Sequence, residues 1–382
     1  MNNWQTVALG DVCTLLNGRA YKKNELLSEG KYPVLRVGNF FSNRKWYYSD
    51  LELEENKYCD NGDLLYAWSA SFGPRIWEGE KVIYHYHIWK TKLDEKRINK
   101  RFLYYWFDWD TNQIKSDHGA GSTMIHVTKS SMEKRKLRLP PLPEQKRIVA
   151  ILDKAFEGID TAIANTEKNL ANARELFESY LKSVFLENNW ETKSLNEISV
   201  NLDKKRVPIT KGKRVSGNIP YYGASGIVDY VKDYIFDGNY LLVSEDGANL
   251  IARTYPIAFS VSGKSWVNNH AHILEFKDSA SQKFIEFYLN SIPLEPYISG
   301  MAQPKLNQKK LNEIPIPYPD KATRENIVKK AGVLKDQSRS LENVYQQKLT
   351  ALSELKQSLL NKAFSGELTT IKDDELRTEA VA

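Results

Sequence analysis

The sequence predicts an α+β protein with two similar mixed α/β domains, separated by two long antiparallel coiled-coil helices and related by a pseudo-twofold internal repeat. Three observations predict this class. The chain of 382 residues is too long for one ordinary domain, its two halves repeat one another, and each half ends in a long run with coiled-coil periodicity. In order, we expect a mixed domain at 1–142, a helix at 143–188, a second mixed domain at 189–316, a second helix at 317–366 and an acidic, frayed tail at 367–382.

The repeat is visible in short motifs that recur at a nearly constant distance. Asn3–Thr6 (NWQT) returns as Asn189–Thr192 (NWET), and His85–Ile88 (HYHI) returns at almost the same offset as His270–Ile273 (HAHI). The period is much longer than that of a solenoid repeat. We therefore interpret it as a duplicated domain.

Each mixed domain combines β-type runs with glycine-rich turns and closes with a proline cluster. The clearest predicted strands are Tyr32–Val37, Asp63–Trp68 and Tyr240–Ser244. The proline clusters are Leu139–Pro143 and Ile314–Pro319. Proline suits a chain that leaves a sheet and enters a helix, so these clusters predict the start of each long helix.

The two helical segments match at one constant offset, which relates Ile148 to Ile327 and, without a gap, Phe185 to Phe364. Their apolar positions advance by alternating steps of four and three, with one extra step of four around Thr166 in the first segment and at the matching place in the second. The predicted seam positions are 148, 152, 155, 159, 162, 166, 170, 173, 177, 180 and 184, and then 327, 331, 334, 341, 345, 349, 352, 359 and 363, with polar residues at 338 and 356. Because the two segments share a period and a defect, we expect them to pack on each other; the alternative is that each helix covers its own domain.

Charge and cysteine content narrow the class of protein. The formal net charge is +6, and residues 1–142 carry 22 basic and 17 acidic side chains, so the positive excess lies mainly in the first domain and suits a polyanionic partner. Cys13 and Cys59 cannot build a disulfide framework, which favours a reducing, cytoplasmic location. The N-terminus lacks the pattern of a signal peptide, and no apolar run predicts a membrane span.

Signatures of catalysis are weak. We find no phosphate-binding loop motif and no Asn/Asp-Pro-Pro-aromatic tetrapeptide of amino-methyltransferases. Asp246 followed by Glu275-Phe-Lys277 matches a nuclease pattern only loosely. The pairs His85/His87 and His270/His272 could each offer two imidazoles to a metal, but no further ligand stands at matching places in both halves. We interpret these histidines as structural or DNA-facing and predict no metal site.

With these features, the chain resembles the specificity subunits of type I restriction–modification systems over nearly its whole length. The most specific stretches are Leu139–Val149 (LPPLPEQKRIV), which leads into the first helix, and Leu359–Leu368 (LLNKAFSGEL), which closes the second. Ile219–Gly226 (IPYYGASG) and Gly300–Asn307 (GMAQPKLN) are typical of the family's target-recognition domains, and Gly121–His126 (GSTMIH) is the variant in the first half. The chain departs from the pattern at the start of the second helix, where PDKATRENI is two residues longer than LPEQKRI.

The resemblance implies a non-catalytic subunit whose two target-recognition domains each read one half of a bipartite, asymmetric site in double-stranded DNA. The helices would fix the spacing and dock two modification (methyltransferase) subunits. Restriction/translocase subunits would complete the complex, and no membrane would be involved. The chain itself would bind no cofactor. S-adenosylmethionine would belong to the modification subunit, and ATP and Mg to the restriction subunit.

Candidate DNA-binding residues are the basic, amide, hydroxyl and aromatic side chains that stand on predicted loops. Lys and Arg neutralise phosphates, while Arg, Asn, Gln and carboxylates can read base edges. Glu245 could accept a hydrogen bond from a cytosine amino group, and Gln303 could bridge adenine. In the first domain the candidates are Arg19, Tyr21, Lys22, Arg36, Asn39, Arg44, Arg75, Ser122, Thr123 and His126; in the second they are Lys204, Arg206, Lys213, Arg214, Tyr222, Ser225, Glu245, Asn249, Lys264, Gln303 and Lys305.

Two other classes stay open from the residues themselves. One is an enzyme, either a nuclease or a fused methyltransferase, which the missing motifs disfavour. The other is a scaffold in which the paired helices hold protein domains and DNA has no part.

Overall fold

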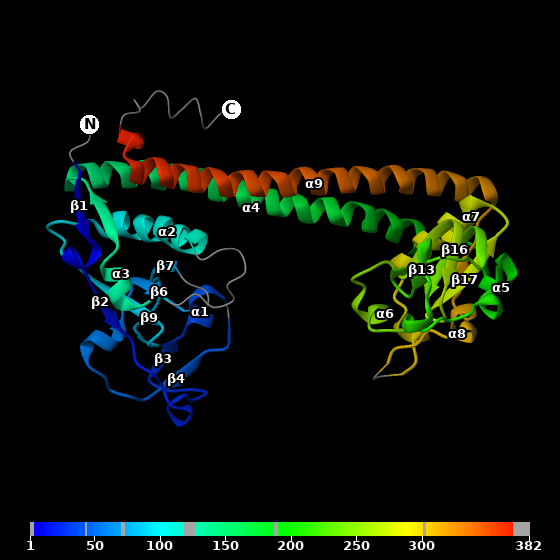
Figure 1. Cartoon of the computed structure of the whole chain (residues 1–382), viewed down its shortest axis with the longest axis horizontal. Helices are drawn as coiled ribbons and strands as arrows, with labels where there is room; N and C mark the ends of the chain where they lie inside the picture. The colour runs from blue at the N-terminus through cyan, green and yellow to red at the C-terminus, as the bar shows by residue number, and fades with distance from the viewer. Residues whose placement is uncertain are drawn as a thin grey trace. The chain divides into compact units, whose positions relative to one another are not determined.

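We describe the protein from a computed structural model that places residues 4–42, 44–69, 73–117, 127–186, 190–300 and 303–369. The chain forms two compact units. Unit 1 comprises residues 1–165 and 348–382, and unit 2 comprises residues 166–347 (Figure 1). The division cuts both long helices, and it falls at Thr166, where the predicted seam has its extra step. In the described part of the chain, no helix combines the length and apolar character needed to cross a membrane.

Unit 1 contains two four-stranded sheets and a two-stranded ribbon. The first sheet has the order β2-β9-β6-β7 and the second has the order β4-β3-β8-β5, while β1 pairs with β10. Their bounds are β1 Gln5–Ala8, β2 Cys13–Asn17, β3 Tyr32–Leu35, β4 Tyr47–Ser49, β5 Tyr58–Cys59, β6 Leu64–Ala67, β7 Gly73–Ile76, β8 Val82–Tyr84, β9 Ile88–Leu93 and β10 Lys136–Leu139. The helices are α1 Val37–Phe41, α2 Lys100–Asp117, α3 Lys129–Glu133 and the long α4 Leu142–Leu186, whose first half belongs to this unit.

Unit 2 contains one six-stranded sheet in the order β12-β17-β15-β16-β13-β14, and a ribbon of β11 and β18. The strands are β11 Thr192–Lys193, β12 Ser199–Asn201, β13 Ser216–Gly223, β14 Gly226–Val231, β15 Phe236–Ser244, β16 Ala258–Val267, β17 Ala271–Phe276 and β18 Ile316–Pro317. The helices are α5 Leu195–Ile198, α6 Asn249–Ala252, α7 Ser279–Ser291, α8 Gln308–Asn312 and the long α9 Lys321–Ser365, whose first half belongs here.

The sheets confirm the internal repeat. The strand order β2-β9-β6-β7 of unit 1 matches the order β12-β17-β15-β16 of unit 2. Each unit also has one parallel pair of strands, β3 with β8 in unit 1 and β13 with β16 in unit 2. The long strand β16 corresponds to β7 and β8 together. The predicted strand at Tyr32–Val37 ends at Leu35, because Arg36 becomes the N-cap of the short helix α1.

The two long helices pack together, as the shared seam predicted. In unit 1 the first half of α4 packs against the second half of α9, with Lys356 Nζ 2.7 Å from Asp160 Oδ1. In unit 2 the pairing is reversed, and the buried Ser338 hydroxyl donates to the backbone carbonyl of Ala173. The helices therefore run antiparallel. Leu341 departs from the predicted seam because it is 38% exposed, whereas Ser338, a polar position of the same seam, is buried.

The start of each long helix is held by a buried polar side chain at equivalent positions. Gln145 is fully buried; its amide nitrogen donates to the carbonyls of Arg97 (2.9 Å) and Pro140 (2.8 Å), and its oxygen accepts from the backbone N–H of Asn99 at 2.8 Å. The residue that the helix repeat makes equivalent in unit 2 is the buried Arg324, which donates to the carbonyl of Pro319. The longer segment PDKATRENI at the start of the second helix thus keeps a buried polar side chain at this position, and α9 begins at Lys321.

Each unit has its own apolar core, to which both long helices contribute. In unit 1, Phe364 of α9 is 4% exposed and lies 5.4 Å, between ring centroids, from Phe102 of α2. Figure 1 shows α2 running alongside this part of α4 and α9. In unit 2, Phe185 of α4 lies 5.2 Å from Phe284 of α7. The two cysteines of unit 1, Cys13 and Cys59, are buried and free.

Candidate nucleic-acid interface

In both units, candidate DNA-binding residues gather beside strand ends of the sheet, and in unit 1 these are the ends of the parallel strands. In unit 1, β3 and β8 end at Leu35 and Tyr84, and the next residues are Arg36 and His85. The backbone N–H of His85 donates to the carbonyl of Leu35 at 2.9 Å, which fixes this junction. Side chains that follow strand ends on a rigid sheet are well placed to recognise a ligand.

The unit 1 junction contains a cavity of about 400 Å³. Three of the predicted residues, Arg36, Asn39 and Arg44, line it. The Asn39 amide donates to the backbone carbonyl of Arg44 at 2.7 Å, which holds the two sides of the cavity together. The remaining lining residues are Val37, Gly38, Lys45, Tyr47, His85 and His87.

Of the other described candidates of unit 1, three are engaged with neighbouring residues. Arg19 makes a two-pronged ion pair with Glu25, at 3.0 and 2.8 Å, and its guanidinium lies 5.4 Å from the centre of the Tyr21 ring. Burial raises the pKa of Tyr21, whose hydroxyl donates to the carbonyl of Tyr84. Lys22 is exposed, and Arg75 donates to the carbonyl of Phe40. Ser122, Thr123 and His126 lie outside the described residues.

Unit 2 has a buried network of charges beside the ends of β12 and β15 and the start of β17. His272 is 1% exposed; its Nδ1 lies 2.5 Å from Asp203 Oδ2, and its Nε2 lies 2.8 Å from the carbonyl oxygen of Leu306. Arg206 donates to Glu245 at 2.7 Å, and Lys305 lies 3.2 Å from the same carboxylate. The network therefore joins four segments that are far apart in the sequence.

The charge balance of this network explains the state of Asp203. Burial raises the pKa of this carboxyl, but the hydrogen bond and charge of His272, the backbone N–H of Ile273 and the charge of Arg206 outweigh burial and hold the pKa below its ordinary value. Asp203 is thus an anion whose partners are all provided by unit 2.

The ligand atoms of Asp203, Glu245 and His272 lie within 4.8 Å of one another, so this group could hold a metal ion by geometry. Arg206 and Lys305 already supply positive charge to both carboxylates. This arrangement favours an internally compensated ion network over a metal centre. Sequence reasoning missed the group because its three members stand on segments that are widely separated in the sequence.

The other candidates of unit 2 divide into free and engaged side chains. Lys204, Lys213, Ser225 and Gln303 are exposed. Arg214 pairs with Asp229 at 2.9 Å, and the Asn249 amide exchanges hydrogen bonds with the backbone of Tyr255. Lys264 lies over the ring of Tyr234, and the half-buried Tyr222 ring lies 6.1 Å from Phe259.

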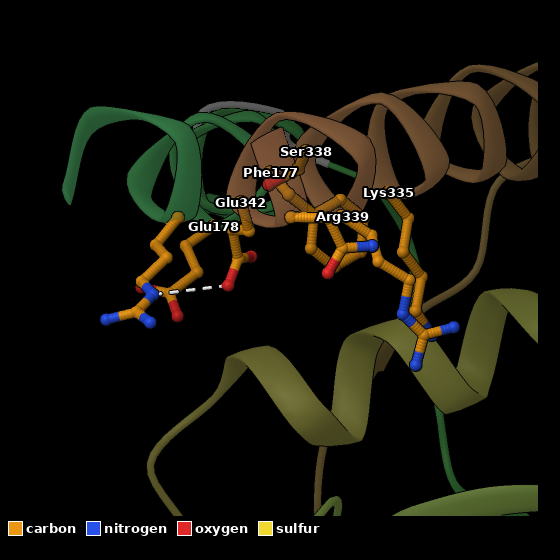
Figure 2. Close-up of a pocket in the computed structure, with 8 residues that line it drawn as sticks. Phe177, Glu178, Lys335, Ser338, Arg339 and Glu342 are labelled. Atoms are coloured by element: carbon orange, nitrogen blue, oxygen red, sulfur yellow. Dashed lines mark hydrogen bonds and ion pairs between the residues drawn. The ribbon is translucent and has the colours of Figure 1, made fainter. Parts of the chain in front are cut away.

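A second cavity, of about 430 Å³, lies on the helix pair within unit 2. Figure 2 shows Lys335, Arg339 and Glu342 leaving α9 on one side, with Phe177 and Glu178 coming from α4. Glu342 pairs with Arg174 at 3.2 Å, and the Phe177 ring lies 5.7 Å from Phe287 of α7. The lining of this second cavity contains both positive and negative side chains, whereas the lining of the unit 1 cavity contains no carboxylate.

Two matched sheets, each with polar side chains at one strand junction and each joined to a shared helix pair, define a protein with two repeated recognition domains. The chain belongs to the family described as the type I restriction modification DNA specificity domain, which matches residues 1–172 and again residues 187–351. The family resemblance seen in the sequence is thereby confirmed.

Among known proteins, the chain is similar to a putative type I restriction enzyme specificity subunit of Haemophilus influenzae, with 38% identity over 160 residues that cover 42% of this chain and 40% of that protein. It is also similar to the EcoBI specificity subunit of Escherichia coli, with 24% identity over 96% of this chain and 87% of the relative.

Among solved structures, a chain described under complex assembly and conformational transition of the type I R-M system shares the fold, with a TM-score of 0.72, 20% identity, and coverage of 94% of this chain and 97% of that one. The HsdS subunit from Thermoanaerobacter tengcongensis gives a TM-score of 0.52 at 19% identity, covering 95% and 97%.

Proposed function

We propose that this chain is the non-catalytic DNA-specificity subunit of a type I restriction–modification complex, and that each unit reads one half of a bipartite, asymmetric site in duplex DNA. One observation carries the proposal. The DNA specificity domain matches both halves of the chain, and the two halves fold into sheets of matching strand order. A duplicated reader is what a split site requires, because each half-site must meet its own set of side chains.

In this proposal the long helices dock two modification subunits and set the spacing between the half-sites. Helices α4 and α9 have 45 residues each. Their exposed faces, including the charged surface at Lys335 and Arg339, are available to protein partners. The modification subunits would bring S-adenosylmethionine and methylate adenine, and restriction/translocase subunits would bring ATP and Mg. The assembly would work in the cytoplasm, in keeping with two free cysteines.

The spacing role is tested by lengthening both helices by one heptad, after Thr166 in α4 and after Tyr345 in α9. Seven residues add about 10 Å of helix, which corresponds to about three base pairs of duplex DNA. Methylome sequencing of cells that express the variant with its modification partner should reveal the same half-sites separated by a spacer about three base pairs longer.

The matched control carries a heptad inserted between Lys232 and Asp233, an exposed turn of unit 2. It should keep the original spacer. An unchanged spacer in the helix variant would refute the spacing role. Methylation or cleavage of DNA by the purified chain without partners would favour an enzyme, and the absence of any DNA footprint with modification subunits present would favour a scaffold.

A further inference from the structure

The cavity of unit 1 is lined by positive charge without a compensating carboxylate. Its lining includes Arg36, Arg44 and Lys45, and no Asp or Glu stands among the lining residues. None of these three cations forms an ion pair with a carboxylate in the described part of the chain, and Arg36 instead lies over the Tyr47 ring, 5.2 Å from its centre. Three cations around one cavity repel one another, so an anion that entered would relieve that repulsion.

The imidazoles of the cavity are consistent with this positive potential. Burial, and then the charges of His87 and Arg36, lower the pKa of His85 to about 4. His85 is therefore neutral at physiological pH, and the potential at its ring disfavours a further proton. The same potential favours an incoming anion.

The ion network of unit 2 has a different character, and the strand registers relate one of its members to a residue of unit 1. Gly18 N–H donates to the carbonyl of Ile88, and Leu202 N–H donates to the carbonyl of Ile273, so the next residues, Arg19 and Asp203, are equivalent. The place of Arg19, which pairs with Glu25 in unit 1, is thus taken by a buried anion in unit 2.

The histidines of the repeated motif also differ in their partners. In unit 2, both ring nitrogens of His272 are occupied, one by Asp203 and one by the carbonyl of Leu306. Glu245 belongs to the same network and forms an ion pair with Lys305. In unit 1, His85 and His87 line the cavity, and His85 Nδ1 accepts from the backbone N–H of His87 at 3.4 Å.

We propose that the cavity of unit 1 binds a backbone phosphate of duplex DNA, whereas the ion network of unit 2 excludes phosphate because its own carboxylates occupy the cations there. The proposal rests on the proposed function, which makes duplex DNA the ligand. Arg and Lys are the side chains that neutralise phosphates, and Arg can do so with two parallel hydrogen bonds. The exposed Lys204 and Lys213 of unit 2 lie outside its ion network and can still contact phosphates elsewhere.

The test is the salt dependence of binding to random-sequence duplex DNA, measured with the full-length chain in complex with its modification subunits. Phosphate contacts weaken with salt by a slope of about 0.9 in log K against log salt for each phosphate neutralised. The triple variant Arg36→Gln/Arg44→Gln/Lys45→Gln should flatten the slope by at least about 0.9. It should also weaken all sequences alike.

The matched control is Lys92→Gln/Lys96→Gln/Lys136→Gln, which removes the same charge from exposed positions of unit 1, near the opposite end of β9 from His87. Its slope should stay close to that of the wild type. Lys305→Gln should also leave the slope unchanged, because Lys305 is neutralised by Glu245 before DNA arrives. Thermal unfolding of each variant confirms that the chain is folded.

The outcomes separate the inference from the function it rests on. If the wild-type complex binds duplex DNA with a steep salt slope and the cavity variant keeps that slope, the phosphate site is wrong and the proposed function stands. If Lys305→Gln flattens the slope by about 0.9, the exclusion of phosphate from unit 2 is wrong. If the wild-type complex binds no duplex DNA, the proposed function itself fails.

Discussion

Replacing Asp203 by alanine should destabilise unit 2 more than any other single change at its strand junction. The carboxylate meets His272 Nδ1 at 2.5 Å and the backbone N–H of Ile273 at 2.9 Å, and it lies 3.5 Å from the Arg206 guanidinium. Its side chain is only 7% exposed, so water cannot replace these partners without opening the structure.

The expected cost follows from the partners that are left behind. Removing one member of a buried ionic group costs about 3–5 kcal/mol, because the remaining charges stay buried without compensation. Asp203→Asn should cost less than Asp203→Ala. The amide oxygen can still accept from the backbone N–H of Ile273, and the amide keeps the shape of the carboxylate.

The pH dependence has a definite sign. Because folding lowers the pKa of Asp203, its contribution to stability is fully present above its unfolded value of 3.8. The contribution is lost as the pH falls through the lower folded value. Unit 2 of the wild type should therefore lose stability in acid below about pH 4, and Asp203→Asn should lose less over the same range.

Hydrogen exchange of the β12 and β17 amides is the suitable assay, because a chain with two separate cores need not unfold in one transition. A cost of about 3–5 kcal/mol should raise the equilibrium constant for opening, and with it the exchange rate, by roughly 150- to 4,000-fold. Asp233→Ala, at an exposed carboxylate of the same unit, is the control and should change exchange little. If Asp203→Ala and Asp233→Ala exchange at the same rate, the network does not stabilise unit 2.

Three further predictions concern unit 1. Gln145→Ala should destabilise unit 1 by about 3 kcal/mol or more, because it leaves the backbone groups of Asn99, Arg97 and Pro140 without partners. Faster hydrogen exchange at the start of α4 would show this loss. A loss below about 1 kcal/mol would contradict the role of Gln145 in holding the start of the helix. Phe364→Ala should destabilise unit 1 by about 3–5 kcal/mol, because it leaves a cavity against Phe102 and Trp109. The control Leu355→Ala, at a 43% exposed position of α9, should cost little. Equal urea unfolding midpoints of the two variants would refute the packing of Phe364. Binding of duplex DNA should raise the pKa of His85 from about 4, which NMR titration of its ring would follow, and an unchanged pKa would place no phosphate near this ring. Because the pKa of His85 in the folded chain lies below its ordinary value of 6.5, unit 1 should also lose stability as the pH falls from about 6.5 to about 4.

The sequence by itself determined the architecture of the protein. The constant offset between the helical segments, the repeated histidine motif and the apolar seam are local patterns, and each depends on a period that neighbouring residues impose on a helix or strand. The structure returned them as two long packed helices and two sheets of matching strand order. It changed only details, such as the exposure of Leu341, which the sequence placed in the seam.

Only the tertiary structure decided which basic residues remain free to meet a polyanion. Arg36 and Arg206 look alike in the sequence, since each is a basic residue near a predicted loop. Folding brings Glu245, distant in the sequence, to 2.7 Å from Arg206, but brings no carboxylate to the cavity that Arg36 lines. Charge is a property of each side chain, whereas its compensation depends on distances that are set only when the chain folds, and this is why the cavity of unit 1 and the ion network of unit 2 differ.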